Sequence, residues 1–105
     1  YLNDYFEEGI ESPYMLYSQT VKEDKRDKIP AITHVDNTCR IQTVGEGILS
    51  ELLEEYYKIS KVPVLLNTSF NDNGKPIVET PEDAIQSFND MNIDYLVLNN
   101  TIITK

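Results

Sequence analysis

Apolar residues recur at helical spacing in two segments of the chain. In the segment after Gly45 and Gly47, which ends by Ser60-Lys61, they occupy one face, while glutamates and a lysine occupy the other. The second segment begins at Thr80, a favourable N-cap residue, and Pro81 suits the first helical position. Its apolar positions are Ala84, Ile85, Phe88 and Met91. We predict a helix over each segment, and a shorter amphipathic helix that ends at Gly9.

Short runs of β-branched and aromatic residues predict strands between the helices. The predicted strands are residues 14–21, 31–36, 38–44, 62–66, 95–98 and 101–104. The second and third are expected to form a hairpin through Asn37, because Asn tolerates positive φ. The run 95–98 is uninterrupted and apolar, which is typical of a central strand. Since strands and helices do not alternate strictly, the pattern predicts an α+β fold with a mixed β-sheet and packed helices.

Composition limits the class of protein. The 105 residues suit one domain, and eighteen Asp and Glu against nine Lys and Arg give a formal net charge of −9. Such a chain is poorly suited to duplex nucleic acid, whose binding requires cations opposite phosphates. A single cysteine excludes an intrachain disulfide, and no apolar run is long enough to suggest a membrane span. The one basic cluster, residues 22–28, is interrupted by acidic residues and is predicted to be a solvated loop.

Residues 67–76 are the first candidate for a binding site. They follow the predicted strand 62–66, which would hold them at the end of the sheet, where open sheets bind ligands. Hydroxyls, amides, a glycine and a lysine are concentrated there. Together with backbone N–H donors, these groups suit phosphate or carboxylate oxygens. The alternative is a turn rich in Asn and Asp that satisfies its own backbone.

A second candidate lies around Arg40, in the predicted strand 38–44. Its guanidinium could clamp a phosphate through two hydrogen bonds, or it could pair with one of the many carboxylates. His34, Asp36 and Cys39 match no common zinc spacing and have no second His or Cys beside them, so we predict no metal site. We expect Cys39 to be a small core residue and His34 to be a hydrogen-bonded structural residue.

Three blocks of sequence carry a family resemblance. They are Ser12-Pro13-Tyr14-Met15, residues 30–44 with His34-Val35-Asp36 and Arg40-Ile41-Gln42, and residues 62–78 with Leu66-Asn67-Thr68-Ser69-Phe70-Asn71. These blocks, which extend over nearly the whole chain, resemble the carboxy-terminal domain of the NodU/CmcH/TobZ family of O-carbamoyltransferases. Asn37 and Cys39 stand where that family usually has Gly and Ala. Because Asn accepts positive φ at modest cost, the turn is expected to survive.

The resemblance implies a YrdC-like domain that forms carbamoyl-adenylate from the substrates ATP and carbamoyl phosphate and releases pyrophosphate. A separate amino-terminal domain of Kae type, which would hold the metal ion, is implied to transfer the carbamoyl group to a hydroxyl acceptor. By motif, Arg40 and Ser69 are expected to contact phosphate or the carbamoyl-adenylate, with Asn67 and Asn71 as second choices. No residue of this chain is predicted to act as a covalent catalyst.

The chain begins at Tyr1 rather than Met, and we expect residues 1–105 to be the carboxy-terminal portion of such a domain. By itself this portion is expected to be inactive, and an uncovered sheet edge or apolar face would favour a homodimer. The resemblance implies a cytoplasmic enzyme, because ATP and carbamoyl phosphate are found there. Two alternatives stay open: a non-catalytic module that holds a nucleotide or phosphate, and a structural fragment whose loop binds nothing.

Overall fold

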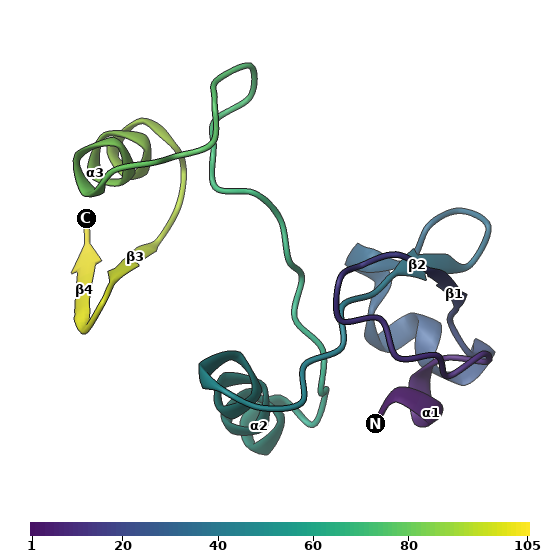
Figure 1. Cartoon of the computed structure of the whole chain (residues 1–105). Coiled ribbons are helices and arrows are strands. Elements are labelled where there is room, and N and C mark those ends of the chain that lie inside the picture. Colours follow the sequence, from purple (N-terminus) through teal and green to yellow (C-terminus); the bar gives the residue numbers. More distant parts are fainter. The chain divides into compact units, whose positions relative to one another are not determined.

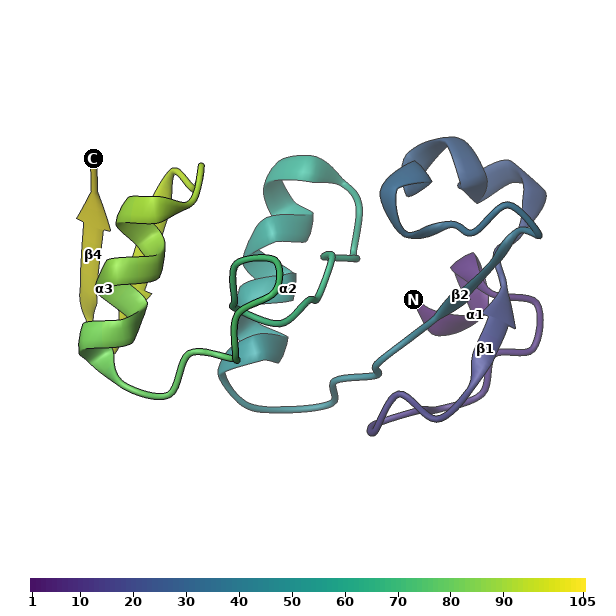
Figure 2. The same cartoon turned by 90° about the horizontal axis from the view of Figure 1, so that it is seen from above.

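The computed structural model describes residues 1–105 and divides the chain into two compact units, Tyr1–Leu66 and Asn67–Lys105 (Figures 1 and 2). The first unit contains α1 (Leu2–Tyr5), β1 (Ser18–Thr20), the 3₁₀ helices η1 (Glu23–Lys28) and η2 (Pro30–Ile32), β2 (Thr38–Arg40) and α2 (Ile48–Ser60). The second unit contains α3 (Pro81–Asp90), β3 (Tyr95–Leu98) and β4 (Thr101–Thr104). Helices and small antiparallel sheets occur together, which confirms the α+β class.

The first unit is organised around the antiparallel pairing of β1 and β2, in which Gln19 lies opposite Cys39. Because side chains alternate along a strand, these two residues face the core while Arg40 faces outward. Phe6 forms an antiparallel bridge with Val21, which joins the end of α1 to the residue after β1. The buried core consists of Tyr5, Phe6, Val21, Ile29, Cys39 and Ile41.

Two buried polar side chains fasten the loop before β1 to this core. Gln19 is 0% exposed, and its amide both donates to the carbonyl oxygen of Ile10 at 2.5 Å and accepts from the Ile10 N–H at 2.9 Å. Ser12 is 1% exposed; its N–H donates to Thr43 Oγ1 at 2.9 Å, and the Thr43 N–H donates to its carbonyl oxygen at 3.0 Å. The Ser12 side chain accepts from the Leu16 N–H at 3.0 Å. The Gln19 amide and Ser12 therefore make hydrogen bonds that strand pairing does not provide at this loop.

Helix α2 confirms the predicted amphipathic helix, including its start after Gly47 and its end at Ser60-Lys61. It ends at Lys61, which has φ of 61° and donates its N–H to the Tyr57 carbonyl at 2.8 Å. None of its residues is buried, and Ile48 and Ile59 are 81% and 85% exposed. The helix has formed, but most of its apolar face is uncovered.

In the second unit, α3 packs on the hairpin of β3 and β4. Phe88 of α3 and Leu96 of β3 are buried in a common cluster. The helix begins as predicted: Pro81 is its first residue, and Thr80 Oγ1 accepts a hydrogen bond from the Asp83 N–H at 3.1 Å. The opposite face of the hairpin is exposed, so this unit has a one-sided core.

The turn predicted at Asn37 is present, but it does not connect two strands. Asn37 has φ of 66°, and the His34 N–H donates to the Thr38 carbonyl at 2.8 Å. Residues 31–36, predicted as a strand, instead contain the end of η2 and this turn. Pro30 is the first residue of η2, and its fixed φ favours a helical turn at this point. Strand β2 consequently pairs with β1.

The predicted strand at residues 62–66 and the predicted mixed sheet are both wrong. Val62 and Val64 pack on the core of the first unit, but no other segment pairs with their backbone. A short apolar run becomes a strand only where a partner supplies the ladder hydrogen bonds. Similarly, β3 forms a two-stranded antiparallel hairpin with β4 and is not a central strand.

Replacing Gln19 by Leu is expected to lower the free energy of unfolding by about 1–3 kcal/mol, because the hydrogen-bonding groups of Ile10 lose their partner. Urea denaturation followed by circular dichroism measures this change. The control is Ser18→Ala on the exposed side of β1, which should change stability by less than about 0.5 kcal/mol. A Gln19→Leu variant as stable as the unmodified chain would contradict this role of the amide.

Candidate functional site

Arg40 lies at the end of β2, with an exposed side chain on the outer face of the strand pair. It forms no ion pair, although the chain contains eighteen acidic residues. The alternative that Arg40 is paired with a carboxylate is therefore wrong for this structure. A guanidinium with all five N–H donors available is suited to bind a phosphate or carboxylate ligand.

The turn that precedes β2 is held by the side chain of Asp36. Its Oδ1 accepts hydrogen bonds from Thr38 Oγ1 at 2.7 Å and from the Thr38 N–H at 3.1 Å. These bonds, that from the hydroxyl first, hold the pKa of the Asp36 carboxyl below its usual value. His34 Nδ1 lies 3.4 Å from the same Thr38 hydroxyl, in agreement with a structural role. The turn thus sets the direction in which the chain enters β2 and reaches Arg40.

Cys39 is 2% exposed in the core of the first unit, as predicted for a small core residue. Burial raises the pKa of its thiol, which lowers the population of the nucleophilic thiolate at neutral pH. No three His, Cys, Asp or Glu side chains lie together as a group that could hold a metal ion. No helix has both the length and the apolar character needed to cross a bilayer.

The loop at residues 67–76 makes an internal network of hydrogen bonds. Ser69 Oγ donates to Asn71 Oδ1 at 2.6 Å, and Asn71 Nδ2 donates to the Lys75 carbonyl at 3.0 Å. The base of the loop is closed by the Val78 N–H, which donates to the Phe70 carbonyl at 3.0 Å. The loop therefore satisfies part of its own backbone, as the alternative interpretation predicts. For an anion to accept a hydrogen bond from Ser69, this hydroxyl must turn away from Asn71.

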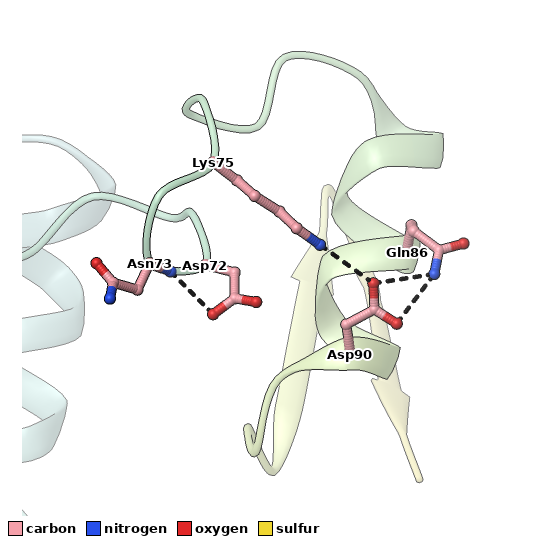
Figure 3. A network of polar contacts seen from close by, with 5 residues as sticks. All are labelled: Asp72, Asn73, Lys75, Gln86 and Asp90. Carbon is pink, nitrogen blue, oxygen red and sulfur yellow. Dashed lines mark hydrogen bonds and ion pairs between the residues drawn. The ribbon is translucent and has the colours of Figure 1, made fainter.

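A second set of contacts ties the loop to α3 (Figure 3). Lys75 Nζ lies 3.7 Å from Asp90 Oδ2, and Gln86 Nε2 lies 3.1 Å from each oxygen of the same carboxylate. Within the loop, Asp72 Oδ1 accepts from the Asn73 N–H at 2.8 Å. No local pattern in the sequence indicates this role of Asp90, because the ion pair joins residues that are distant along the chain.

The structure brings together some of the predicted site residues. Ser69 and Asn71 are in direct contact, and Asn67 is an exposed residue at the start of the same unit. Arg40 belongs to the other unit. Its convergence with Ser69 on one ligand stays a prediction. We predicted that a strand at residues 62–66 would hold the loop at the end of the sheet. This prediction is wrong, since these residues do not form a strand.

Similarity to a known family shows the kind of protein to which these residues belong. The whole chain, residues 1–105, matches the family described as Carbamoyltransferase C-terminus. The chain belongs to this family. The match confirms the resemblance found in the sequence blocks around Arg40 and Ser69 and makes the chain part of a carbamoyltransferase.

The curated relatives are much longer proteins, and the chain matches only part of each. The carbamoyltransferase domain is 40% identical to Nodulation protein NolNO of Sinorhizobium fredii, covering 98% of this chain and 16% of that protein. It is 36% identical to Nodulation protein U of Rhizobium tropici, covering 97% and 18%, respectively. An uncharacterized protein of Synechocystis is 40% identical, with 99% of this chain and 21% of that protein covered. The domain thus spans about a fifth of the length of these relatives.

Replacing Thr38 by Val in the carbamoyltransferase domain is expected to raise the pKa of Asp36, because the hydroxyl donor to its carboxylate is lost. In the folded state the carboxyl titrates below its unfolded value of about 3.9. Its stabilising contribution is therefore present above that value and is lost as the pH falls through the lower, folded value. Carboxyl-carbon NMR across the acid range measures the shift.

The control for this titration is Thr101→Val, on the exposed surface of β4. That substitution should leave the Asp36 titration unchanged. If Thr38→Val also left it unchanged, the hydroxyl would not be the group that holds the pKa down.

Proposed function

We propose that this domain contributes to the site that forms carbamoyl-adenylate from ATP and carbamoyl phosphate. The observation that carries the proposal is the exposed and unpaired guanidinium of Arg40, in a chain with a large excess of carboxylates. Because the Arg40 side chain is exposed and in no ion pair, its N–H donors are open to an anionic ligand. Its availability supports a role in binding an anionic substrate, and the membership of a carbamoyltransferase family supports this pair of substrates.

Ser69 and the neighbouring amides would complete the anion site. Phosphate oxygens are bound well by a charged donor together with short hydroxyl and amide donors from other directions. Ser69 would donate its hydroxyl after turning away from Asn71 Oδ1. Asn71 would donate through Nδ2 after releasing the carbonyls of Asp72 and Lys75. Asn67 would supply a further side-chain amide from the start of the loop.

The proposed chemistry requires no nucleophile from this domain. Water releases inorganic phosphate from carbamoyl phosphate and leaves carbamate. A carbamate oxygen then attacks the α-phosphorus of ATP, which forms carbamoyl-adenylate as the bond to the β-phosphate breaks and pyrophosphate leaves. Arg40 and Ser69 would position the phosphates and stabilise the negative charge that develops on them. The remainder of the carbamoyltransferase, with its metal-dependent Kae-type domain, would transfer the carbamoyl group to a hydroxyl acceptor. The location we propose is the cytoplasm, where both substrates are made.

The alternative is a domain that binds a nucleotide or phosphate without turnover, or that serves only as a structural part of the enzyme. The internal hydrogen bonds of Ser69 and Asn71 favour it, because a loop that satisfies itself needs no ligand to be stable. Binding of ATP by the isolated domain would argue against the structural role. Release of pyrophosphate would separate a catalytic domain from a binding module.

In a full-length carbamoyltransferase that contains this domain, Arg40→Ala is expected to slow pyrophosphate release by roughly 10- to 100-fold. The reason is the loss of a charge-assisted contact worth about 1.5–3 kcal/mol. Ser69→Ala removes a neutral donor and should cost less, about 2- to 10-fold. The rate is measured by coupled pyrophosphate detection with ATP and carbamoyl phosphate.

The control is Lys58→Gln, which removes one positive charge that is already paired with Glu55. It should leave the rate unchanged, and the isolated domain should form no carbamoylated product. If Arg40→Ala matched the unmodified enzyme, or if the isolated domain carried out transfer by itself, the proposal would be wrong.

The isolated domain is expected to form dimers or larger species, because the apolar face of α2 is largely exposed to water. Placing charges there, as Ile48→Glu with Ile59→Glu, should shift the domain towards a monomer in multi-angle light scattering. The control is Val35→Glu, which charges a fully exposed apolar residue outside α2. A clean monomer of the unmodified domain at high concentration would rule out this association.

A further inference from the structure

The first unit contains a cavity of about 480 Å³ whose walls carry a concentration of positive charge. Four of the chain's nine basic residues line it: Lys22, Lys25, Lys28 and Lys61. Only two carboxylates, those of Asp4 and Asp24, line the same cavity. In a chain with a net charge of −9, this local excess of cations needs a physical explanation.

The geometry of η1 explains how three of these lysines come together. A 3₁₀ helix has three residues per turn, so side chains three positions apart lie above one another. Lys22 is the N-cap of η1, and Lys25 and Lys28 follow at intervals of three. The intervening acidic residues occur at other positions of the turn. Residues 22–28 were predicted from the sequence to be a solvated loop. The 3₁₀ helix instead places their three lysines in a row beside the cavity.

The ammonium groups are held mostly by partners that carry no negative charge. Lys25 Nζ lies 5.3 Å from the ring centroid of the buried Tyr5, and Lys61 Nζ lies 5.9 Å from that of Tyr57. Lys22 Nζ donates to the Asn3 carbonyl at 2.6 Å, and Lys61 Nζ to a helix carbonyl at 3.1 Å. Aromatic rings and carbonyls orient an ammonium group without neutralising it.

Compensation by carboxylates is weak at this cavity. The only ion pair among its lysines joins Lys25 Nζ to Asp24 Oδ2 at 3.8 Å, and the Asp24 side chain is 74% exposed. Such a long, solvated pair contributes little. Lys28 makes no hydrogen bond or ion pair. Each ammonium has three donors, so most of the donors around the cavity remain available to a ligand.

We propose that this cavity binds a small phosphorylated anion, of the size and charge of pyrophosphate or a phosphate monoester, through Lys22, Lys25 and Lys28 of the η1 segment together with Lys61, which follows α2. Like charges gathered at one place repel one another, and a multiply charged anion relieves that repulsion. The volume lies within the usual range for small-molecule sites. The proposal does not rest on the proposed function, because the cavity lining does not include Arg40 or any residue of the loop at 67–76.

Isothermal titration of the 105-residue domain with pyrophosphate at low ionic strength tests the proposal. The double variant Lys28→Gln with Lys61→Gln should weaken binding about tenfold, because two of the four cations are lost. Both side chains are exposed, so their replacement should preserve the fold, and circular dichroism checks this. If the double variant failed to fold, Lys28→Gln alone would serve, with a smaller loss. Parallel titration with inorganic phosphate tells whether one phosphate group suffices.

The matched control is Lys58→Gln, one turn before Lys61 on the same helix and outside the cavity, which should retain full affinity. Equal losses in the control and the double variant, or no binding by the unmodified domain, would overturn the proposal. Ser69→Ala tests whether the loop at residues 67–76, and not the cavity, is the place where pyrophosphate binds. Loss of binding in Ser69→Ala, with binding retained in the double variant, would refute the lysine cavity and favour the loop.

Discussion

The packing of the first unit depends on the antiparallel pair of β1 and β2 and on the buried amide of Gln19 at its centre. Opposite Cys39, this amide takes both backbone hydrogen bonds of Ile10 and draws the preceding loop onto the core. The same register turns Arg40 outward. Because side chains alternate along a strand, Cys39 lies on the apolar inner face and the neighbouring Arg40 keeps its guanidinium in water on the outer face.

Two kinds of cationic group on this domain are available to anions, for different reasons. Arg40 is available because no carboxylate lies near it on the outer face of β2. The cavity lysines are available because rings and carbonyls orient them, leaving most of their charge uncompensated. The clustered lysines repel one another unless an anion binds, whereas Arg40 keeps its donors in water, and both arrangements suit an anionic ligand.

The domain exposes apolar faces on α2 and on the hairpin of β3 and β4, as expected for one part of a longer protein. A helix as amphipathic as α2 would normally bury its apolar side chains, and the hairpin of β3 and β4 is covered by α3 on one face only. The chain spans about a fifth of the length of its relatives. Contact with the remainder of a carbamoyltransferase, or with a second copy, is the natural means of covering these surfaces.

Features that depend on near neighbours along the chain could be predicted from the sequence. The spacing of apolar residues specified α2, the Thr80 cap and Pro81 specified the start of α3, and Asn37 specified a turn with positive φ. Each of these rests on interactions between residues a few positions apart. Motif resemblance likewise led from the blocks around Arg40 and Ser69 to the carbamoyltransferase family.

The pairing of the strands and the charges that remain unpaired are seen only in the folded chain. Residues 62–66 have the composition of a strand but lack a partner backbone, and β2 pairs with β1 instead of the segment before it. The availability of Arg40 and the convergence of Lys61 with the lysines of η1 depend on residues far apart in the chain. Hydrogen-bond ladders and electrostatic environments are formed across such distances, and local sequence patterns contain no information about their partners.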